Sequence, residues 1–514
     1  MATAASQVVR LSPAAAEIRK VLIAGGRKYA SLKEFYAARN FEPVWTGRSK
    51  SASRALLKAL SRAGEHGLPV ARYAPDDLSR LLSKSRRNPD KARAEIAASL
   101  TFLKYAHDVG SGLINPRRID SEISLKRPRR SDLSLLTALA GARRPDVALK
   151  KLQPSHPNYA RLLEEKKRLE KVVRRGGWGK KVPAGDTLKP GMKSRRIPFV
   201  RARLVNMKIA RGLGASQTYD SKLEAAVKKF QLRFGLNADG VIGRRTLAAM
   251  NIAASQRLGQ VVANLERERW MNFDRGSRHV YVNLAAFTVT LYDNGKPIYS
   301  SRVVAGKAKD FKTPEFSDKV THLVVNPSWH VPDSIATEEL LPAIQKDPAF
   351  LANNNMRIIS QEGVTVNPDA VDFSEYSTDN FPYVIKQAPS GGNALGRVKF
   401  MFPNRFNIYL HDTPAKRLFT RDVRAFSHGC VRVQKPFEFA YILLAPQLRD
   451  PKATFARWLA TGEELFVNLA RPVPIHLSYN TAWVDPNGTP QFRFDVYGRD
   501  SRLLRALRKA GVSI

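Results

Sequence analysis

Cys430 is the only cysteine in this 514-residue chain. A lone cysteine excludes an intramolecular disulfide and any multi-cysteine metal site, so this thiol acts as a single sulfur. A thiol becomes a nucleophilic thiolate when a base or a positive charge lies beside it, and His411, His428 and Arg432 are all close in sequence. Free cysteine is often core filler, but the polar and glycine residues at 427–429 are poor core material. The segment therefore predicts a presented, reactive thiol.

The residues around the cysteine alternate as β-strands do. In the stretch 406–411 this alternation points Tyr409 and His411 to the same side of a strand. After the cysteine, the same pattern turns the valines inward and leaves Cys430 and Arg432 on the opposite face. We therefore expect these four side chains to line one pocket.

Asp412 directly follows His411 in the sequence. Continued alternation points Asp412 away from the imidazole, so a backbone carbonyl is its expected hydrogen-bond partner. A zinc site built from His411, His428, Asp412 and Cys430 is the obvious rival interpretation. Two histidines seventeen positions apart with one thiol fit no standard zinc spacing, so no metal site is predicted.

The order of His411 and the segment 427–432 resembles the signature of the L,D-transpeptidases with a YkuD-like catalytic domain, enzymes that cross-link bacterial peptidoglycan. The likeness extends to further strand and loop markers, which fall at 303–307, 313–314, 326–332 and 395–400. It covers about residues 277 to 500. The whole chain is similar to the large multidomain members, which carry a scaffold, a peptidoglycan-binding module and a capping insertion.

The resemblance implies a role for each residue of the motif. Cys430 would be the acyl-accepting nucleophile and His411 its general base. The backbone amides around Gly429 and Cys430, with the Tyr409 hydroxyl, would form an oxyanion hole. Arg432 would hold a donor carboxylate or steady the loop. Three more residues belong to the expected substrate site, and for each a purely structural role stays open: Ser427, His428 and Trp329.

The implied reaction needs neither a metal nor an organic cofactor. The thiolate attacks the L-to-D amide of a tetrapeptide stem, expels D-alanine and leaves a thioester on Cys430. A diaminopimelate amine of a second stem then attacks the thioester and forms the cross-link. Carbapenems are expected to acylate the same sulfur. The alternatives are a cysteine L,D-carboxypeptidase or hydrolase, with water as the acceptor, and a non-catalytic cell-wall-binding protein.

The composition is strongly basic, with 86 Lys and Arg against 45 Asp and Glu and a net charge of +41. Such a field favours polyanions, whether nucleic acid, an anionic lipid surface or a wall rich in stem-peptide carboxylates. No zinc-finger spacing or RNA-binding aromatic signature is present, so a nucleic-acid partner is not predicted. Solvated basic faces without a specific partner remain the simpler alternative.

The first thirty residues lack the apolar core of a signal peptide, and no run is long enough to span a bilayer. A periplasmic location is therefore inferred from the implied substrate, with an export signal absent from this sequence. The residues do not predict an oligomeric state.

The chain is expected to be an α+β multidomain protein. Apolar residues recur at helical spacing in 55–60 and 96–103, and a second set does so within 223–234. From about residue 277 the period becomes that of strands, with an Asn294-Gly295 hairpin turn. The expected domains are a helical scaffold with a basic linker at 1–196, a small helical peptidoglycan-binding-like module at 197–253, a connecting helix at 254–276, and a mainly β catalytic domain at 277–505 with a helical cap at about 333–392.

Overall fold

The computed structural model describes residues 10–514. Residues 1–9 lie outside the described part. They include the start of the expected scaffold region and of the stretch in which an export signal was sought. The chain divides into two compact units. Unit 1 combines the chain up to Asp274 with Asn480–Ile514, and unit 2 is Arg275–Tyr479.

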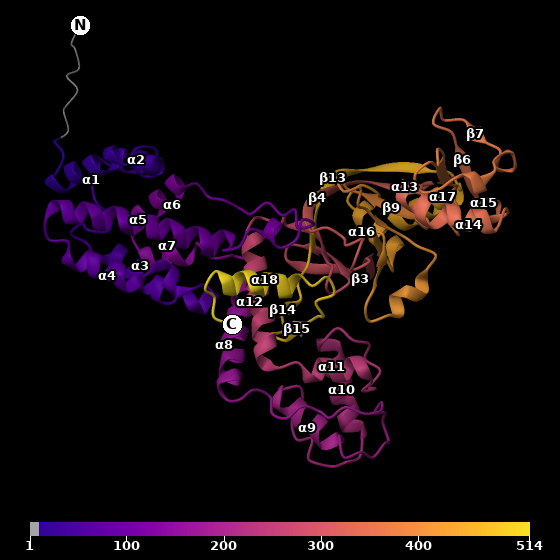
Figure 1. Ribbon diagram of the computed structural model, residues 1–514, viewed down its shortest axis with the longest axis horizontal. Coiled ribbons are helices and arrows are strands. Elements are labelled where there is room, and N and C mark those ends of the chain that lie inside the picture. The colour runs from indigo at the N-terminus through magenta and orange to yellow at the C-terminus, as the bar shows by residue number, and fades with distance from the viewer. Residues whose placement is uncertain (1–9) are drawn as a thin grey trace, which may run out of the picture. The chain divides into compact units, whose positions relative to one another are not determined.

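Unit 1 is helical, as the apolar spacing predicts (Figure 1). Its long helix α5 buries one apolar face against α1 and α4, and both predicted helical segments lie within helices. The helices begin at polar or proline positions, as at Ser12, whose hydroxyl accepts a hydrogen bond from the first turn of α1. The helices that precede unit 2 are α1 Pro13–Ala24, α2 Ala30–Ala37, α3 Ser51–Ser61, α4 Pro75–Lys84, α5 Asn88–Ser111, α6 Asp132–Ala140, α7 Pro145–Lys150, α8 Pro157–Arg174, α9 Ile197–Asn206, α10 Ser221–Arg233, α11 Arg244–Asn251 and α12 Ala254–Trp270.

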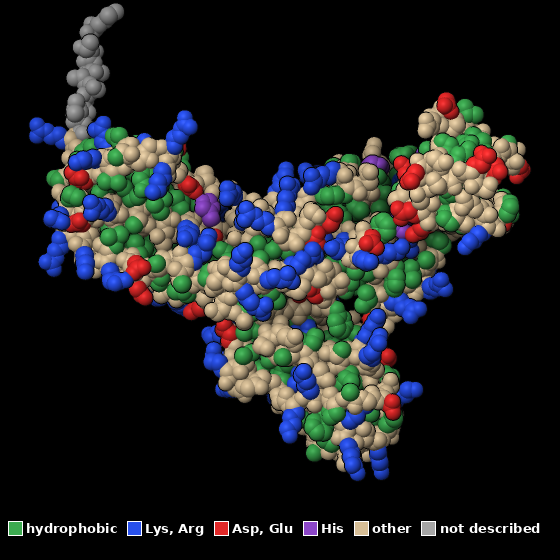
Figure 2. Space-filling view, in the orientation of Figure 1, with side chains coloured by type: hydrophobic (Ala, Val, Ile, Leu, Met, Phe, Trp, Pro, Cys, Tyr) green, Lys and Arg blue, Asp and Glu red, His purple; other side chains and the backbone are tan. Residues whose placement is uncertain are grey.

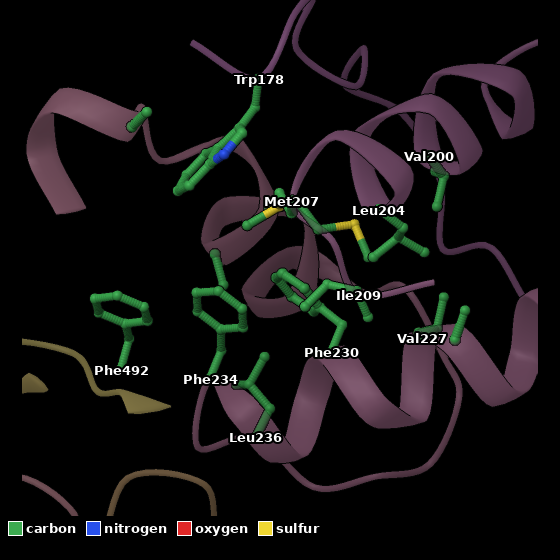
Figure 3. Packing of buried hydrophobic residues seen from close by; sticks show 14 of the residues in the cluster. Trp178, Val200, Leu204, Met207, Ile209, Val227, Phe230, Phe234, Leu236 and Phe492 are labelled. Carbon is green, nitrogen blue, oxygen red and sulfur yellow. The ribbon is translucent and has the colours of Figure 1, made fainter. Parts of the chain in front are cut away.

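The helices α9, α10 and α11 contribute to an apolar core that also includes side chains of α8, α12, β14 (Ala482–Val484) and β15 (Pro490–Phe492) (Figure 3). Helix α10 begins after Asp220, whose carboxylate accepts a hydrogen bond from Leu223 N–H at 2.8 Å. The rings of Phe230 and Phe234 stack at 4.2 Å between centroids. The predicted apolar face is buried throughout, and its members are Leu223, Ala226, Val227, Phe230 and Phe234. These aromatic residues are therefore core residues, as expected.

The C-terminal segment also belongs to unit 1. Strands β14 (Ala482–Val484) and β15 (Pro490–Phe492) pair with each other, and helix α18 (Arg499–Lys509) follows. Their apolar side chains complete the helical core, where Phe492 stacks on Phe234 at 5.6 Å. The expected catalytic domain, 277–505, thus runs past the end of unit 2 at Tyr479.

Unit 2 is built on a nine-stranded sheet with the order β11-β3-β12-β10-β9-β4-β13-β1-β2. Because β2 also pairs with β3, the sheet closes on itself. The predicted Asn294-Gly295 turn joins β2 to β3, and both of its residues have positive φ, as a tight hairpin turn requires. The strands are β1 Arg278–Asn283, β2 Thr288–Asp293, β3 Lys296–Gly306, β4 Phe316–Val325, β9 Val398–Met401, β10 Leu410–His411, β11 Ala425–Ser427, β12 Val431–Val433 and β13 Leu465–Ser478, with helices α16 Pro436–Leu444 and α17 Pro451–Ala460.

The insertion between β4 and β9 differs in part from the purely helical cap that was expected. It has helices, but it also carries a four-stranded sheet with the order β5-β8-β6-β7. The short strands escape a periodicity argument because each spans only two to four residues. The elements are β5 Trp329–His330, α13 Asp333–Ile335, the π-helical turn Ala336–Leu340, α14 Leu341–Lys346, α15 Phe350–Asn353, β6 Met356–Ile359, β7 Thr365–Val366 and β8 Val384–Gln387.

Charge is unevenly distributed over the surface. In Figure 2 Lys and Arg side chains are spread over the visible face and do not gather in one patch, whereas acidic side chains are concentrated on the insertion. Within residues 10–514, no helix is both long enough and apolar enough to cross a lipid bilayer.

Candidate active site

Cys430 lies directly before β12, and His411 ends the neighbouring parallel strand β10. The register places His411 opposite Arg432, and Val431 N–H donates to Tyr409 C=O at 3.0 Å. Because adjacent strands are about 4.8 Å apart, residues distant in the sequence become neighbours. The sheet therefore brings together the four side chains that the alternation pattern predicted to share a pocket.

The alternation after the cysteine is confirmed. Val431 and Val433 are fully buried beneath the sheet, whereas Cys430 and Arg432 are half-buried on the other face. The ring of His411 contacts edge to face the ring of Tyr409, the residue directly before β10, at 5.6 Å between centroids.

The strand predicted for 406–411 is wrong over most of its length, because only Leu410–His411 is paired in the sheet. Asn407 has a φ of 52°, in the left-handed region, which ends an extended conformation. The side chain of Asn404 holds this turn, donating to Ile408 C=O at 2.7 Å and accepting from Phe406 N–H at 3.0 Å. Local hydrogen bonding thus overrides the alternating pattern.

That turn supplies a partner for the sulfur. The Cys430 thiol donates to Asn407 C=O at 3.6 Å, and the Tyr409 hydroxyl also hydrogen-bonds the sulfur. No hydrogen bond joins the sulfur to the imidazole of His411 in the described structure. Cys430 and His411, the candidate nucleophile and base, are therefore neighbours across β10 and β12, and the thiol is turned toward the Asn407 carbonyl.

The loop before the sulfur is held by its own polar side chains. The Ser427 hydroxyl donates to Cys430 C=O at 2.5 Å and accepts from Gly429 N–H at 3.3 Å. Thr313 donates to Gly429 C=O at 2.6 Å. Gly429 has a φ of 119°, and a Cβ there would lie 3.1 Å from Ile408 Cδ1. This position therefore requires glycine.

Those contacts limit which amides can bind a ligand. The Gly429 N–H is already shared with Ser427, whereas the Cys430 N–H has no acceptor among the described residues. The Cys430 amide and the Tyr409 hydroxyl are thus the donors available beside the sulfur, and Ser427 shapes the loop.

The electrostatics keep both Cys430 and His411 neutral. Burial raises the pKa of the Cys430 thiol to about 11, although the Tyr409 hydrogen bonds and the charges of Arg432 and Lys399 act in the opposite direction. Burial and the charge of Arg432 lower the pKa of His411 to about 3. The ground state is therefore a neutral thiol beside a neutral imidazole.

The His411 ring is oriented by the residues packed around it and not by one hydrogen bond. The Asp412 carboxylate accepts from Arg397 N–H at 3.0 Å and contacts Lys416, so it does not orient the imidazole, as expected. The backbone groups of Asp412 and Leu395 lie close enough to raise the pKa of His411 slightly. Its buried Nδ1 nevertheless forms no hydrogen bond of normal geometry with a described residue.

Lys399 is a site residue that the sequence argument did not select. It lies opposite His411 on β9, and its ammonium is 6.0 Å from the centroid of the Tyr409 ring. Burial lowers its pKa, and the neighbouring Glu464 and Cys430 raise it. The sequence does show that Lys399 lies between the fully buried Val398 and Phe400, as in a strand with one polar face. It does not show that this strand pairs with the one that carries His411.

His428 faces a different set of residues. Its Nε2 lies 2.7 Å from Oε1 of Glu339 and 3.3 Å from Nζ of Lys307, and its ring contacts Phe311 at 4.5 Å. Burial would raise the pKa of Glu339, but the hydrogen bond and charge of His428, with the charge of Lys307, lower it overall. Because Glu339 lies in the insertion, His428 links the cysteine loop to that insertion.

Trp329 lies in the insertion rather than beside the sulfur. It forms part of β5, pairs with Gln387 of β8 and packs against the apolar core of the insertion. Its placement fits a core role, and none of its described contacts involves the Cys430 loop.

A metal centre and a separate cavity would be rival sites. Across residues 10–514 no group of three or more His, Cys, Asp or Glu side chains could hold a metal ion. A cavity of about 550 Å³ lies among α5, α6 and α7, but its lining has no cysteine, histidine or carboxylate.

The comparisons with known proteins agree with this geometry. Residues 277–464 match the family model of the L,D-transpeptidase catalytic domain, residues 199–250 match a "Putative peptidoglycan binding domain", and residues 30–165 match a scaffold domain. The chain is 37% identical over 227 residues to a "Putative L,D-transpeptidase" of Haemophilus influenzae. That alignment covers 44% of this chain and 45% of the relative, less than half of its length.

Several solved structures with detectable likeness are L,D-transpeptidases. One from Xylanimonas cellulosilytica is 15% identical, with 57% of this chain and 98% of that one covered and a TM-score of 0.18. One from Stackebrandtia nassauensis is 15% identical, with coverages of 59% and 98% and a TM-score of 0.22. TM-scores this low carry no structural conclusion. The family matches identify an L,D-transpeptidase catalytic domain in this chain, together with a peptidoglycan-binding and a scaffold domain.

Proposed function

We propose that this protein is a peptidoglycan L,D-transpeptidase that forms a thioester on Cys430. The observation that carries the proposal is the parallel pairing of β10 with β12, which brings the half-buried thiol beside His411 and Tyr409. The match to the L,D-transpeptidase catalytic domain over 277–464 supports the same reaction class.

The first half-reaction begins with both groups neutral. The thiol rotates from the Asn407 carbonyl toward His411, which accepts its proton as sulfur attacks the scissile carbonyl. The S–C bond forms while the carbonyl oxygen takes up negative charge, and the Cys430 amide and Tyr409 hydroxyl donate to it. Imidazolium then returns the proton to the departing nitrogen, the C–N bond breaks, and D-alanine leaves.

The second half-reaction uses an amine of another stem. His411 accepts the proton of that amine as its nitrogen attacks the thioester. The imidazolium then returns the proton to the sulfur as the C–S bond breaks, which regenerates the thiol. Arg432 holds a carboxylate of the donor, because its guanidinium forms no hydrogen bond with a described residue. The chemistry needs no cofactor.

The remaining domains fit a wall substrate. The match at 199–250 supports binding to peptidoglycan, and the net charge of +41 favours a polymer rich in carboxylates. Such a substrate lies outside the cytoplasm, and a periplasmic location is part of this proposal.

Incubation with tetrapeptide muropeptides tests the proposal directly. The full chain should release D-alanine and form cross-linked dimers, and Cys430→Ala should do neither. Release of D-alanine without dimers would assign a carboxypeptidase instead. No release by the intact chain would leave only wall binding, which sedimentation with purified peptidoglycan would measure.

Carbapenem labelling provides an independent test. A solved L,D-transpeptidase is in complex with imipenem, so imipenem is a suitable probe. One adduct per chain is expected in the intact-mass spectrum, and it should be absent from Cys430→Ala. An adduct that persists in that variant would contradict the assignment of the nucleophile.

A further inference from the structure

The pocket face of the sheet carries two cations, one on each side of His411. The register pairs His411 with Arg432 of β12 in one direction and with Lys399 of β9 in the other. Directly paired residues point to the same face of a sheet, and neighbouring strands are about 4.8 Å apart. Lys399 and Arg432 therefore flank the imidazole on the face that carries Cys430.

Neither cation forms an ion pair with a carboxylate of the described residues, although Glu339 lies near Arg432 and Glu464 lies near Lys399. Lys399 forms no ion pair or hydrogen bond through its ammonium with a described residue, and its described contact is the face of the Tyr409 ring at 6.0 Å. The guanidinium of Arg432 forms no hydrogen bond either, and its Nε is buried. Two half-buried cations without partners are costly to desolvate unless an anion binds between or beside them.

One carboxylate lies near Lys399 without forming an ion pair with it. Glu464 is the carboxylate that affects it, but that side chain accepts from Ser328 N–H at 2.9 Å. Its other titratable neighbours are Cys430, His411, Tyr409, His322 and His330. None of these supplies a negative charge while the thiol is protonated.

We propose that Lys399 binds a carboxylate of the acyl donor, as a second anion-binding residue beside Arg432. This rests on the proposed function and specifies its substrate as a donor with carboxylates on both sides of the scissile amide. In a tetrapeptide stem, the D-alanine terminus and the diaminopimelate side chain each carry one. Lys399 takes one and Arg432 the other, so the scissile carbonyl is held between them at His411 and Cys430.

The test uses protection of the thiol and needs no turnover. The rate of Cys430 alkylation by iodoacetamide is measured on the full chain with increasing amounts of two ligands, free D-alanine and the tripeptide stem that ends in diaminopimelate. At least one ligand should slow alkylation of the wild type. Lys399→Gln should require about tenfold more of one of them, which identifies the carboxylate that Lys399 holds, and Lys399→Arg should restore most of the protection.

The control removes the same charge elsewhere on the sheet. Lys319 is exposed on β4, and Lys319→Gln should protect like the wild type. Comparison with the unliganded rate of each variant removes any change in intrinsic thiol reactivity. Three outcomes would overturn the proposal. The first is that both ligands protect Lys399→Gln and the wild type equally, and the second is that Lys319→Gln loses as much protection as Lys399→Gln. The third is that neither ligand protects the wild type. Protection without D-alanine release from tetrapeptides would instead overturn the proposed function alone.

Discussion

Two histidines lie close to Cys430 in sequence, and the fold gives them opposite surroundings. His411 is buried on a central strand between two cations, and its pKa falls to about 3. His428 lies on the loop before the sulfur and hydrogen-bonds Glu339 of the insertion. The first environment keeps an imidazole neutral, whereas the second joins an imidazole to the insertion.

The comparison shows that adjacency in sequence does not decide which histidine shares the pocket face with Cys430. His428 is two residues from Cys430, but its ring is engaged by Lys307, Glu339 and Phe311. His411 is nineteen residues away and becomes a neighbour through parallel strand pairing. The distinction can be tested by changing each histidine separately.

The largest effect is expected from His411→Asn. Loss of a general base should lower kcat/KM for D-alanine release about 10²- to 10⁴-fold. His428→Asn should lower it less than about tenfold, because it removes a link and leaves the base in place. Steady-state kinetics on tetrapeptide muropeptides measure both. Equal losses in the two variants would contradict the contrast between the sites.

The second effect concerns the pH dependence of the thiol. A pKa of about 11 means that the alkylation rate with iodoacetamide should rise about tenfold per pH unit and level off only near pH 11. Arg432→Gln should move this inflection upward, because it removes a charge that lowers the thiol pKa. His428→Asn should leave it in place. An inflection near pH 7 in the wild type would show a thiolate–imidazolium pair instead.

The third effect is on stability in acid. Below pH 6.5 the unfolded chain protonates residue 411, but the folded chain does so only near pH 3. The unfolded state therefore binds more protons, and this site costs about 1.4 kcal/mol of stability per unit as pH falls through that window. The difference between urea midpoints at pH 7 and pH 4.5 should be smaller in His411→Asn. An unchanged difference would show that His411 titrates normally in the folded protein.

The smallest effect is expected at the link to the insertion. Glu339 is 46% exposed in its side chain, so solvent screening limits its coupling with His428 to about 0.5–1 kcal/mol. A double-mutant cycle of Glu339→Gln and His428→Asn, measured by unfolding free energy, gives this value. Additive effects would mean that the contact contributes nothing measurable.

Part of the site could be predicted from local pattern. Alternation in β12 placed Cys430 and Arg432 on the face opposite two buried valines, and the fold confirms this. The same argument failed for 406–411, where Asn404 and Asn407 form a turn. Alternation describes residues that are already in a strand, and it does not reveal side-chain hydrogen bonds that end one.

The fold, like the site, could be predicted only where local geometry decides it. The apolar face of α10 and the Asn294-Gly295 turn depend on local geometry, and both are confirmed. The strands of the insertion were missed because each is too short for a periodic signal. The association of β14 and β15 with unit 1 was also missed, since it depends on which core their apolar side chains complete.

Sequence alone was enough to single out Cys430, to orient the side chains of its own strand and to predict the L,D-transpeptidase catalytic domain that the family model matches at 277–464. Only the tertiary structure placed Lys399 beside His411, turned the thiol toward Asn407 and joined His428 to Glu339. The physical reason is that backbone periodicity is local, whereas strand register and burial depend on residues far apart in the chain. The protonation states of Cys430 and His411 follow from that burial, so they too were decided by the fold.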